Sequence, residues 1–122
     1  MKWLYMLILV FSFITPVEAS EHFKDREFAC KCCGKVLVDQ KLIDKLEELR
    51  GYMDLPIIIT SGYRCSKHNK EVGGVKNSQH IRGKAVDIKV KGMSVRELEE
   101  VCKWAEFSFI KRYKSWVHVD VR

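Results

Sequence analysis

The sequence predicts an α+β fold in which two helices pack on a small, mainly antiparallel sheet. Two segments, beginning near Asp39 and near Ser94, carry apolar residues at the spacing of an amphipathic helix. Four short runs are β-branched or alternate between apolar and polar residues, which is typical of strands; they span residues 57–60, 84–90, 107–110 and 116–121. Helices with one apolar stripe can bury it against such a sheet.

The first helix is expected from Asp39 to Tyr52, because Asp39 is a suitable N-cap and Pro56 ends the unit. Its apolar stripe consists of Leu42, Ile43, Leu46 and Leu49. The second helix opens with the capping box formed by Ser94 and Glu97. Its apolar stripe consists of Leu98, Val101, Cys102 and Ala105.

Between the helices, residues 57–60 predict a buried strand and residues 84–90 an alternating one, which Gly92 ends. The last strand, 116–121, is expected to pair antiparallel with 84–90. Residues 61–78 are rich in Gly, Ser, Asn and Lys and predict a long loop with about one helical turn. Long loops in compact domains usually carry function.

The N-terminal segment predicts export. Lys2 precedes an apolar run to Ile14, and small residues lead to Ala19, so residues 1–19 read as a signal peptide and 20–122 as the mature domain. An uncleaved membrane anchor is the alternative; either way the domain is expected in the periplasm, cell envelope or extracellular space. A net charge of +6 favours anionic partners such as the bacterial wall. Nucleic acid has little support, since no basic stripe is interleaved with aromatic residues.

Five cysteines in a small exported domain favour one or two disulfides over a structural metal. They are Cys30, Cys32, Cys33, Cys65 and Cys102. Because five is odd, at least one thiol is free, paired between chains or bound to metal. The run from Cys30 to Cys33 could also start a zinc site, but a second cysteine pair to complete it is missing.

A candidate metal site is formed by His80, Asp87 and His118. A carboxylate between Val86 and Ile88 is costly to bury unless it is paired or binds a metal. If the strands carrying Asp87 and His118 pair, two imidazoles and a carboxylate can converge, and with an open fourth position they make a catalytic zinc set. Taken singly, each histidine could instead be a hydrogen-bonded core residue, and the aspartate a salt-bridge partner.

The motif that joins these residues resembles the zinc D-Ala-D-Ala carboxypeptidase family. It reads Ser78-x-His80-x-x-Gly83-x-Ala85-x-Asp87, followed by His118-x-Asp120. That family includes murein endopeptidases and phage endolysins, and its metal-site architecture recurs in the hedgehog signalling domain. The likeness runs from about Phe23 to Arg122, includes the segment Thr60 to Cys65, and is closest to short single-domain members. It implies a hedgehog/D-Ala-D-Ala peptidase-like fold.

The resemblance implies one catalytic Zn²⁺ held by His80, Asp87 and His118, with water as the fourth ligand. It implies that Arg64 holds a substrate carboxylate or the developing oxyanion, for which a guanidinium is suited; a solvated loop charge is the alternative. Ser78 either hydrogen-bonds within the site or shapes the turn. Tyr63, Tyr113 and Trp116 are candidates to line the cleft, with Tyr63 next to Arg64 in a substrate role, although core packing is the commoner fate of an aromatic residue.

One position departs from the family. Many relatives have a Glu or His general base three residues before the last zinc ligand, where this chain has Ser115. Asp120, on the same strand face as His118, is therefore the expected base or the orienter of a ligand. A carboxylate that only fixes an imidazole tautomer is the alternative.

The predicted function is a zinc metallopeptidase that hydrolyses amide bonds in peptidoglycan stem peptides or cross-links, of carboxypeptidase or endopeptidase type. It is expected to act as a monomer, with no nucleic-acid partner and no membrane contact beyond an N-terminal anchor. One alternative is a non-catalytic zinc-binding module for the cell wall, favoured by Ser115. Another is a disulfide-stapled basic protein that binds anionic polymers.

Overall fold

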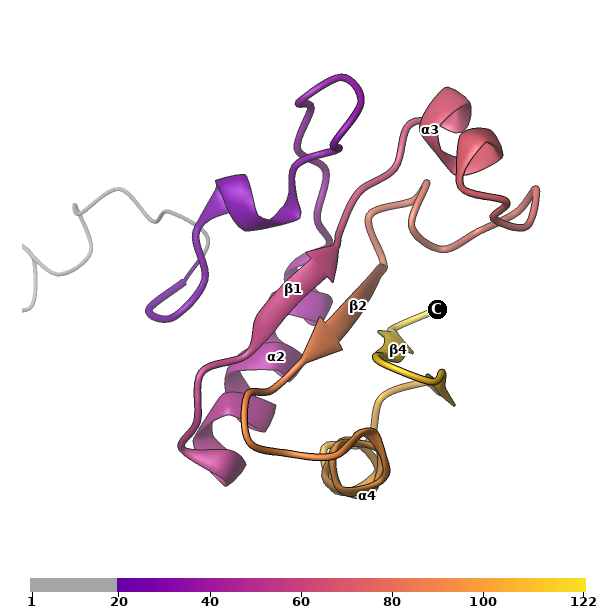
Figure 1. Cartoon of the computed structure of the whole chain (residues 1–122). Coiled ribbons are helices and arrows are strands. Elements are labelled where there is room, and N and C mark those ends of the chain that lie inside the picture. The colour runs from indigo at the N-terminus through magenta and orange to yellow at the C-terminus, as the bar shows by residue number, and fades with distance from the viewer. Residues whose placement is uncertain (1–19) are drawn as a thin grey trace, which may run out of the picture.

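The computed structural model describes residues 20–122, so the predicted signal segment, residues 1–19, lies outside the described residues. The elements are a 3₁₀ helix η1 (Asp25–Phe28), the helices α2 (Gln40–Met53), α3 (Ser66–Glu71) and α4 (Val95–Trp104), and the strands β1 (Ile58–Ser61), β2 (Ala85–Lys89), β3 (Phe109–Arg112) and β4 (Val117–Asp120) (Figure 1). The strands form one antiparallel sheet in the order β1-β2-β4-β3. This confirms the α+β prediction. None of the described helices is both long and apolar enough to cross a membrane.

The two long helices form where their caps and stripes predict them. The Asp39 side chain accepts the N–H of Lys41 at the start of α2, and Asp54 ends that helix in the left-handed conformation, with φ 52°. Ser94 and Glu97 form both hydrogen bonds of the capping box that opens α4. The buried residues of these helices all come from the predicted stripes: Leu42, Ile43, Leu46, Leu49, Leu98 and Cys102.

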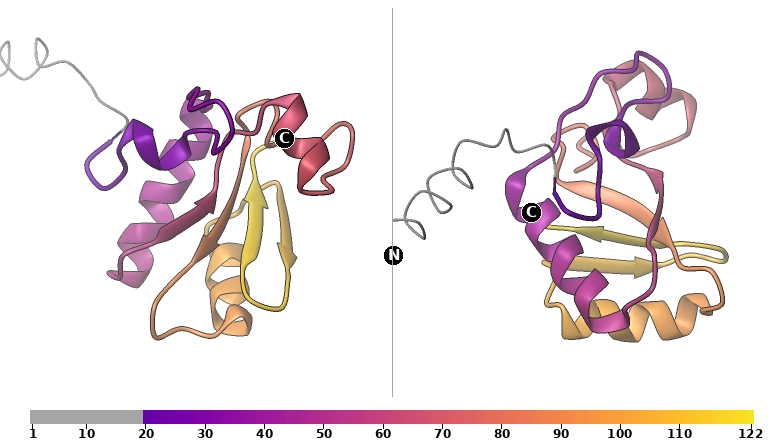
Figure 2. Two further views of the ribbon diagram at one scale, coloured as in Figure 1. Left: turned by 45° about the horizontal axis from the view of Figure 1, so that its top comes forward. Right: turned by 90° about the vertical axis from the view of Figure 1, so that its left-hand side faces the viewer.

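The sheet separates an apolar face from a polar face. The residues Val86 and Ile88 of β2 and Val117 and Val119 of β4 are fully buried and belong to the same core cluster as the stripes of α2 and α4. Because side chains alternate along a strand, Asp87 and His118 lie on the opposite face. Figure 2 shows β3 and β4 as a hairpin beside β2, and Asp87 is paired directly with His118 across β2 and β4. The predicted antiparallel pairing of these strands is confirmed.

Two predicted details differ from the structure. The segment 61–78, expected to be a loop with about one helical turn, contains the six-residue helix α3, so residues 20–122 form three α-helices. The strand expected at 107–110 begins at Phe109, because Glu106 takes a left-handed conformation, with φ 59°, and Phe107 is buried in the core before the pairing with β4 starts.

Close backbone packing holds the end of η1 against Gly62 and Tyr63, the residues that directly follow β1. A Cβ atom at residue 62 would lie 2.7 Å from the backbone of Phe28, so only glycine fits there. Next to it, the Tyr63 N–H donates to the Phe28 carbonyl at 2.9 Å. The loop after η1 is thereby held beside β1 and the residues that lead into α3.

Candidate metal centre and active-site cavity

His80 is fixed in a turn that precedes β2. Its backbone N–H donates to Ser78 Oγ at 3.2 Å, and its carbonyl accepts the N–H of Arg64 at 3.2 Å. The ring nitrogen Nδ1 lies 2.8 Å from the Gly62 carbonyl oxygen. A carbonyl only accepts, so Nδ1 carries the hydrogen and Nε2 presents its lone pair. Ser78, predicted to hydrogen-bond within the site or to shape the turn, accepts the His80 backbone N–H in the turn and also lines the adjacent cavity.

The three predicted ligands converge across the sheet. Asp87 Oδ1 lies 3.2 Å from His80 Nε2 and 3.1 Å from His118 Nδ1. One nitrogen of each histidine and one oxygen of the aspartate all lie within 4.8 Å of one another. His80 and Asp87 are only 2% and 6% exposed, respectively, which separates this cluster from ordinary surface charges. Two imidazoles and one carboxylate at this spacing fit a zinc ion.

Asp120 lies behind His118. It is fully buried, and its Oδ2 lies 2.9 Å from His118 Nε2. Both of its oxygens also accept from the Arg122 guanidinium, at 3.0 and 2.7 Å. The carboxylate therefore directs His118 Nε2 toward itself and leaves Nδ1 facing Asp87. This geometry favours the orienting role of Asp120 over that of a general base, because a base must reach the cavity.

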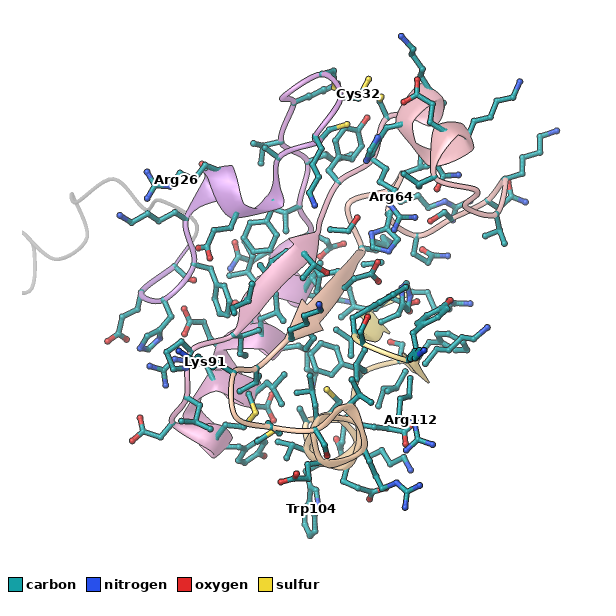
Figure 3. The ribbon with its side chains drawn as sticks, in the orientation of Figure 1. Arg26, Cys32, Arg64, Lys91, Trp104 and Arg112 are labelled. Atoms are coloured by element: carbon teal, nitrogen blue, oxygen red, sulfur yellow. The ribbon has the colours of Figure 1, made fainter. Side chains whose placement is uncertain are left out.

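Arg64 is held against the candidate metal ligands by its whole guanidinium group. Nη2 donates to Asp87 Oδ2 at 3.0 Å, Nε donates to Ser61 Oγ at 3.0 Å, and Nη1 lies 3.4 Å from Asn69 Oδ1. Its side chain is 14% exposed, so it is not a solvated loop charge. Arg64 thus places a fixed positive charge beside the ligand cluster, and Figure 3 shows it between the strands and the α3 segment.

The electrostatics of the cluster favour the ionised form of the Asp87 carboxyl group. Burial acts to raise the pKa of Asp87, but the neighbouring His118 and His80 side chains outweigh it and hold that pKa well below its usual range. Burial acts to lower the pKa of His118, but Asp87 and Asp120 outweigh it and raise that pKa. Asp87 and Asp120 therefore favour a proton on His118, at the place where a divalent cation would bind. A bound cation would displace this proton.

The ligand atoms open into a cavity of about 260 Å³. Its lining comprises Arg64, Val72, Gly73, Gly74, Val75, Ser78, His80, Asp87, Tyr113, Trp116 and His118. Tyr113 and Trp116, both predicted lining candidates, stack with ring centroids 4.8 Å apart and form an aromatic wall. Tyr63 is not part of the lining, so its proposed substrate contact gains nothing from this geometry. Asp87 is the one carboxylate among the described residues of the lining.

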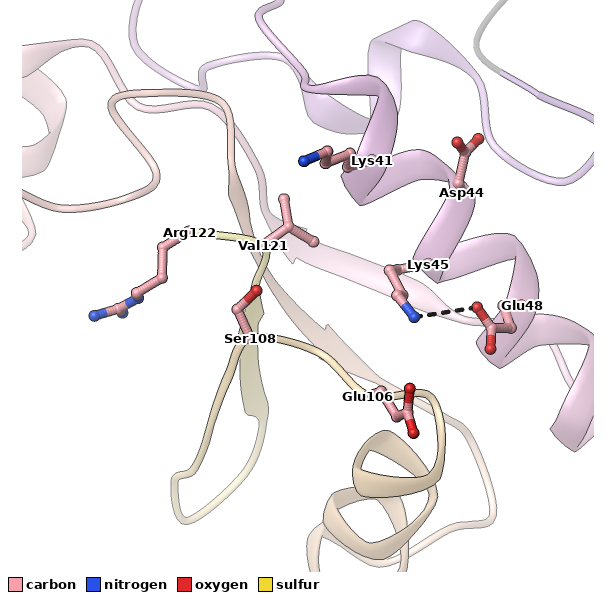
Figure 4. Close-up of a pocket in the computed structure, with 8 residues that line it drawn as sticks. All are labelled: Lys41, Asp44, Lys45, Glu48, Glu106, Ser108, Val121 and Arg122. Atoms are coloured by element: carbon pink, nitrogen blue, oxygen red, sulfur yellow. Dashed lines mark hydrogen bonds and ion pairs between the residues drawn. The ribbon is translucent and has the colours of Figure 1, made fainter.

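Another hollow, of about 330 Å³, lies between α2 and the end of the chain (Figure 4). It is lined by Lys41, Asp44, Lys45, Glu48, Glu106, Ser108, Val121 and Arg122. Lys45 is already bound to Glu48 at 3.4 Å and to the Ala105 carbonyl at 2.8 Å. Neither of the two metal-ligand clusters in the described part of the chain lies there. The cavity of about 260 Å³ beside His80, Asp87 and His118 is therefore the candidate active site.

Sequence reasoning did not find the contacts that support the ligands. The Arg64–Asp87 bond joins residues that are 23 positions apart, and no local pattern signals it. Arg122 follows Asp120 by only two positions, but it lies beyond the end of β4, so the alternation of the strand did not predict their contact. The Gly62 carbonyl that orients His80 is a backbone group, which a residue pattern does not reveal.

Two imidazoles and a carboxylate beside an open cavity are the ligand arrangement that is typical of catalytic, not structural, zinc centres. The sequence pattern of the Peptidase M15 family matches residues 21–120, and the chain belongs to this family of peptidases. The family prediction is confirmed, and with it the predicted fold class.

The chain is also similar to curated relatives. It is 27% identical over 92 residues to the peptidoglycan L,D-endopeptidase MepK of Escherichia coli strain K12, and the same figures hold for MepK of Escherichia coli O157:H7 and of Shigella flexneri. The match covers 68% of this chain and 50% of each relative. The chain thus spans about half the length of the curated relatives it matches.

Proposed function

We propose that this peptidase is zinc-dependent and hydrolyses amide bonds in the stem peptides or cross-links of peptidoglycan. The observation that carries the proposal is the convergence of His80, Asp87 and His118 within 4.8 Å at the floor of a cavity. A zinc ion held there supplies Lewis acidity and lowers the pKa of a bound water to about 7. The MepK relatives are named as peptidoglycan endopeptidases, which supports the substrate class.

The residues of the chain divide the remaining work. The Gly62 carbonyl and the Asp120 carboxylate hold the two imidazoles, so that His80 Nε2 and His118 Nδ1 both face Asp87. Arg64 stands in the cavity wall and can stabilise a substrate carboxylate or the negative charge that develops on the cleaved carbonyl. The stacked pair Tyr113 and Trp116 offers an apolar surface against which a substrate can pack.

Export completes the proposal. The predicted signal segment would deliver the domain to the cell envelope, and its net charge of +6 would raise its local concentration on an anionic wall. The relatives favour an endopeptidase that cuts within the peptides, whereas a carboxypeptidase would place the terminal carboxylate of its substrate on Arg64.

A second candidate is a zinc-binding module that holds the wall without cutting it. Ser115 at the position of the family base favours this alternative, as does the cavity lining, in which Asp87 is the one described carboxylate. Both candidates predict bound zinc, so only a measurement of products separates them.

The test is digestion of purified sacculi followed by mass spectrometry of the released muropeptides. Wild-type protein loaded with zinc is expected to release shortened or uncrosslinked stems, and a chelator is expected to stop the release until zinc is returned. The His118→Ala variant is expected to release none. His22→Ala is the matched control, since His22 is an exposed histidine bound to Glu47, far from the cluster in sequence. Stoichiometric zinc without any new muropeptide would favour the wall-binding module; protein that binds no zinc would overturn both.

A further inference from the structure

A second group of metal-ligating atoms lies outside the cavity. The sulfur atoms of Cys30, Cys33 and Cys65 all lie within 4.8 Å of one another. Two of them come from the loop that follows η1, and the third precedes α3, 32 or more positions further along the chain. All five cysteines of the chain are free thiols, so the disulfides favoured by the sequence are not what the structure contains.

The loop is shaped around the first sulfur. The Cys30 carbonyl accepts the N–H of Gly34 at 2.8 Å, and Gly34 takes the left-handed conformation with φ 74°. The backbone N–H of Cys65 donates to Cys30 Sγ at 3.4 Å. An amide donor on the sulfur stabilises a thiolate, which is the form of cysteine that binds metals.

A fourth cysteine, Cys32, directly precedes Cys33 in the same loop. Its sulfur lies outside the group of three, and a bound metal ion would have to draw it in. Figure 3 shows Cys32 at the tip of its loop, beside the segment that carries α3. A disulfide joins two sulfurs and would leave the others crowded, whereas four thiolates complete the tetrahedral shell of a structural zinc ion.

The surrounding loop needs such a link. Residues 31–37 are all exposed, so no apolar side chain of this stretch anchors it in the core. The loop is held by backbone hydrogen bonds at its base, where the Cys30 N–H donates to the Lys35 carbonyl at 2.8 Å, and by the Lys31 ammonium group, which donates to the Thr60 carbonyl. A metal ion at the cysteines would fix it to the segment that begins directly after Arg64.

We propose that Cys30, Cys33 and Cys65, with Cys32 as the fourth ligand, bind a second zinc ion that has a structural role. This site is separate from the cluster of His80, Asp87 and His118, and it does not depend on the proposed activity. Cys102 takes no part, because it is fully buried in α4 and burial raises the pKa of its thiol to about 12.

The test counts metals on the full chain, purified under reducing conditions and loaded with zinc. Wild-type protein is expected to hold two zinc ions. Cys33→Ser, Cys65→Ser and His118→Ala are each expected to hold one, and the matched control Cys102→Ala two. In His118→Ala, X-ray absorption of the remaining zinc is expected to show sulfur neighbours at about 2.3 Å.

Two measurements on the wild type do not depend on the folding of variants. Cadmium is expected to give a thiolate-to-metal charge-transfer band, and the four cysteines are expected to react with an alkylating reagent only after a chelator is added. Zinc bound in His118→Ala without sulfur neighbours would overturn the proposal. So would a disulfide within this cysteine group in protein recovered from the exporting cell. Because His118→Ala lacks the catalytic cluster, these results stand whether or not the wild type cuts peptidoglycan.

Discussion

The histidine–aspartate cluster and the cysteine cluster offer similar numbers of ligands but are built in different ways. The first takes Asp87 and His118 from two paired strands, and each of its imidazoles is oriented by a second hydrogen bond, to Gly62 or to Asp120. The second takes its sulfurs from two surface segments, where Cys32 and Cys33 are exposed. The first lines a cavity of about 260 Å³, and no cysteine takes part in that lining.

The histidine–aspartate cluster is therefore already arranged without a metal ion, whereas the cysteine cluster would be completed only when a metal ion binds. In the first, neighbouring strands and hydrogen bonds fix the directions of the candidate ligands, which would let a bound ion keep an open position toward substrate. In the second, backbone N–H groups lower the pKa of the Cys30 thiol to about 6 against the effect of burial, but exposed loop residues set the other directions. We therefore expect mutations in the first cluster to affect chemistry and mutations in the second to affect stability.

The largest expected effect comes from Asp87→Asn. The amide keeps the shape of the side chain but removes the charge that bridges His80 and His118, so zinc binding and hydrolysis are both expected to fall to background. The rate of muropeptide release and the zinc content measure this. Asp44→Asn on the exposed side of α2 is the control and is expected to behave as wild type. Full activity in Asp87→Asn would remove the chemical role assigned to this cluster.

Arg64→Ala is expected to lower kcat by about 10²–10³-fold, the usual cost of losing one group that stabilises developing negative charge. Arg64→Lys is expected to recover only part of this, because an ammonium group cannot hold Asp87, Ser61 and a substrate at once. Steady-state kinetics on a defined stem peptide and on its C-terminally amidated form measure the change. Arg82→Ala, at an exposed arginine, is the control.

The two peptide substrates distinguish the roles of Arg64. If Arg64 binds a terminal carboxylate, the wild type is expected to lose activity on the amidated peptide, and the variant to treat both peptides alike. If it stabilises the oxyanion, the variant loses kcat on both. Unchanged kinetics together with weaker zinc binding would leave Arg64 only as a support for Asp87.

Asp120→Asn is expected to weaken zinc binding by about 10–100-fold at neutral pH, because the carboxylate that orients His118 is lost. The pH dependence gives a second readout. Asp87 and Asp120 raise the pKa of His118, so in the wild type protons compete with zinc from above the ordinary histidine pKa of about 6.5, and affinity falls as pH drops through the raised value. The substitution removes one cause of that increase, so the fall is expected at lower pH.

Competition with a chromophoric chelator between about pH 5 and 8 measures both effects of this substitution, across the range in which histidine titrates. If Asp120 were instead the general base, zinc affinity would stay near that of the wild type while kcat fell. That outcome would restore the base role that the sequence suggested and that the buried position of Asp120 disfavours.

The sequence predicted most clearly what local patterns control. Asp39 and the capping box of Ser94 and Glu97 located both long helices, since caps and apolar spacing act over a few residues. Alternation in residues 84–90 and 116–121 predicted that Asp87 and His118 would meet across paired strands. The helix α3 was expected only as one turn, because its sequence, SKHNKE, carries no apolar stripe.

Contacts between distant segments could not be predicted in the same way. The position of Cys65 beside Cys30 depends on the close packing of Gly62 on the Phe28 backbone, which no spacing of cysteines reveals. The sequence accordingly favoured disulfides. The pair of buried Asp120 and half-exposed Arg122 depends on how the chain end turns against β4. The sequence therefore left the role of Asp120 open between a general base and a group that orients His118.

The smallest expected effect on activity, and the one that tests the comparison most directly, comes from Cys33→Ser. If the cysteine cluster is structural, kcat/KM is expected to fall by less than about tenfold, which is below about 1.4 kcal/mol in the transition state. The variant is instead expected to lose the stabilisation that zinc gives at this site, about 2.7 kcal/mol when free zinc is 100 times the dissociation constant. Thermal unfolding of His118→Ala with and without Cys33→Ser measures this, because only the cysteine site then binds zinc, and Cys102→Ala in the same background is the control. A variant that kept this zinc-dependent stability but lost its activity would show that the cysteine loop acts in catalysis and would break the contrast between the two clusters.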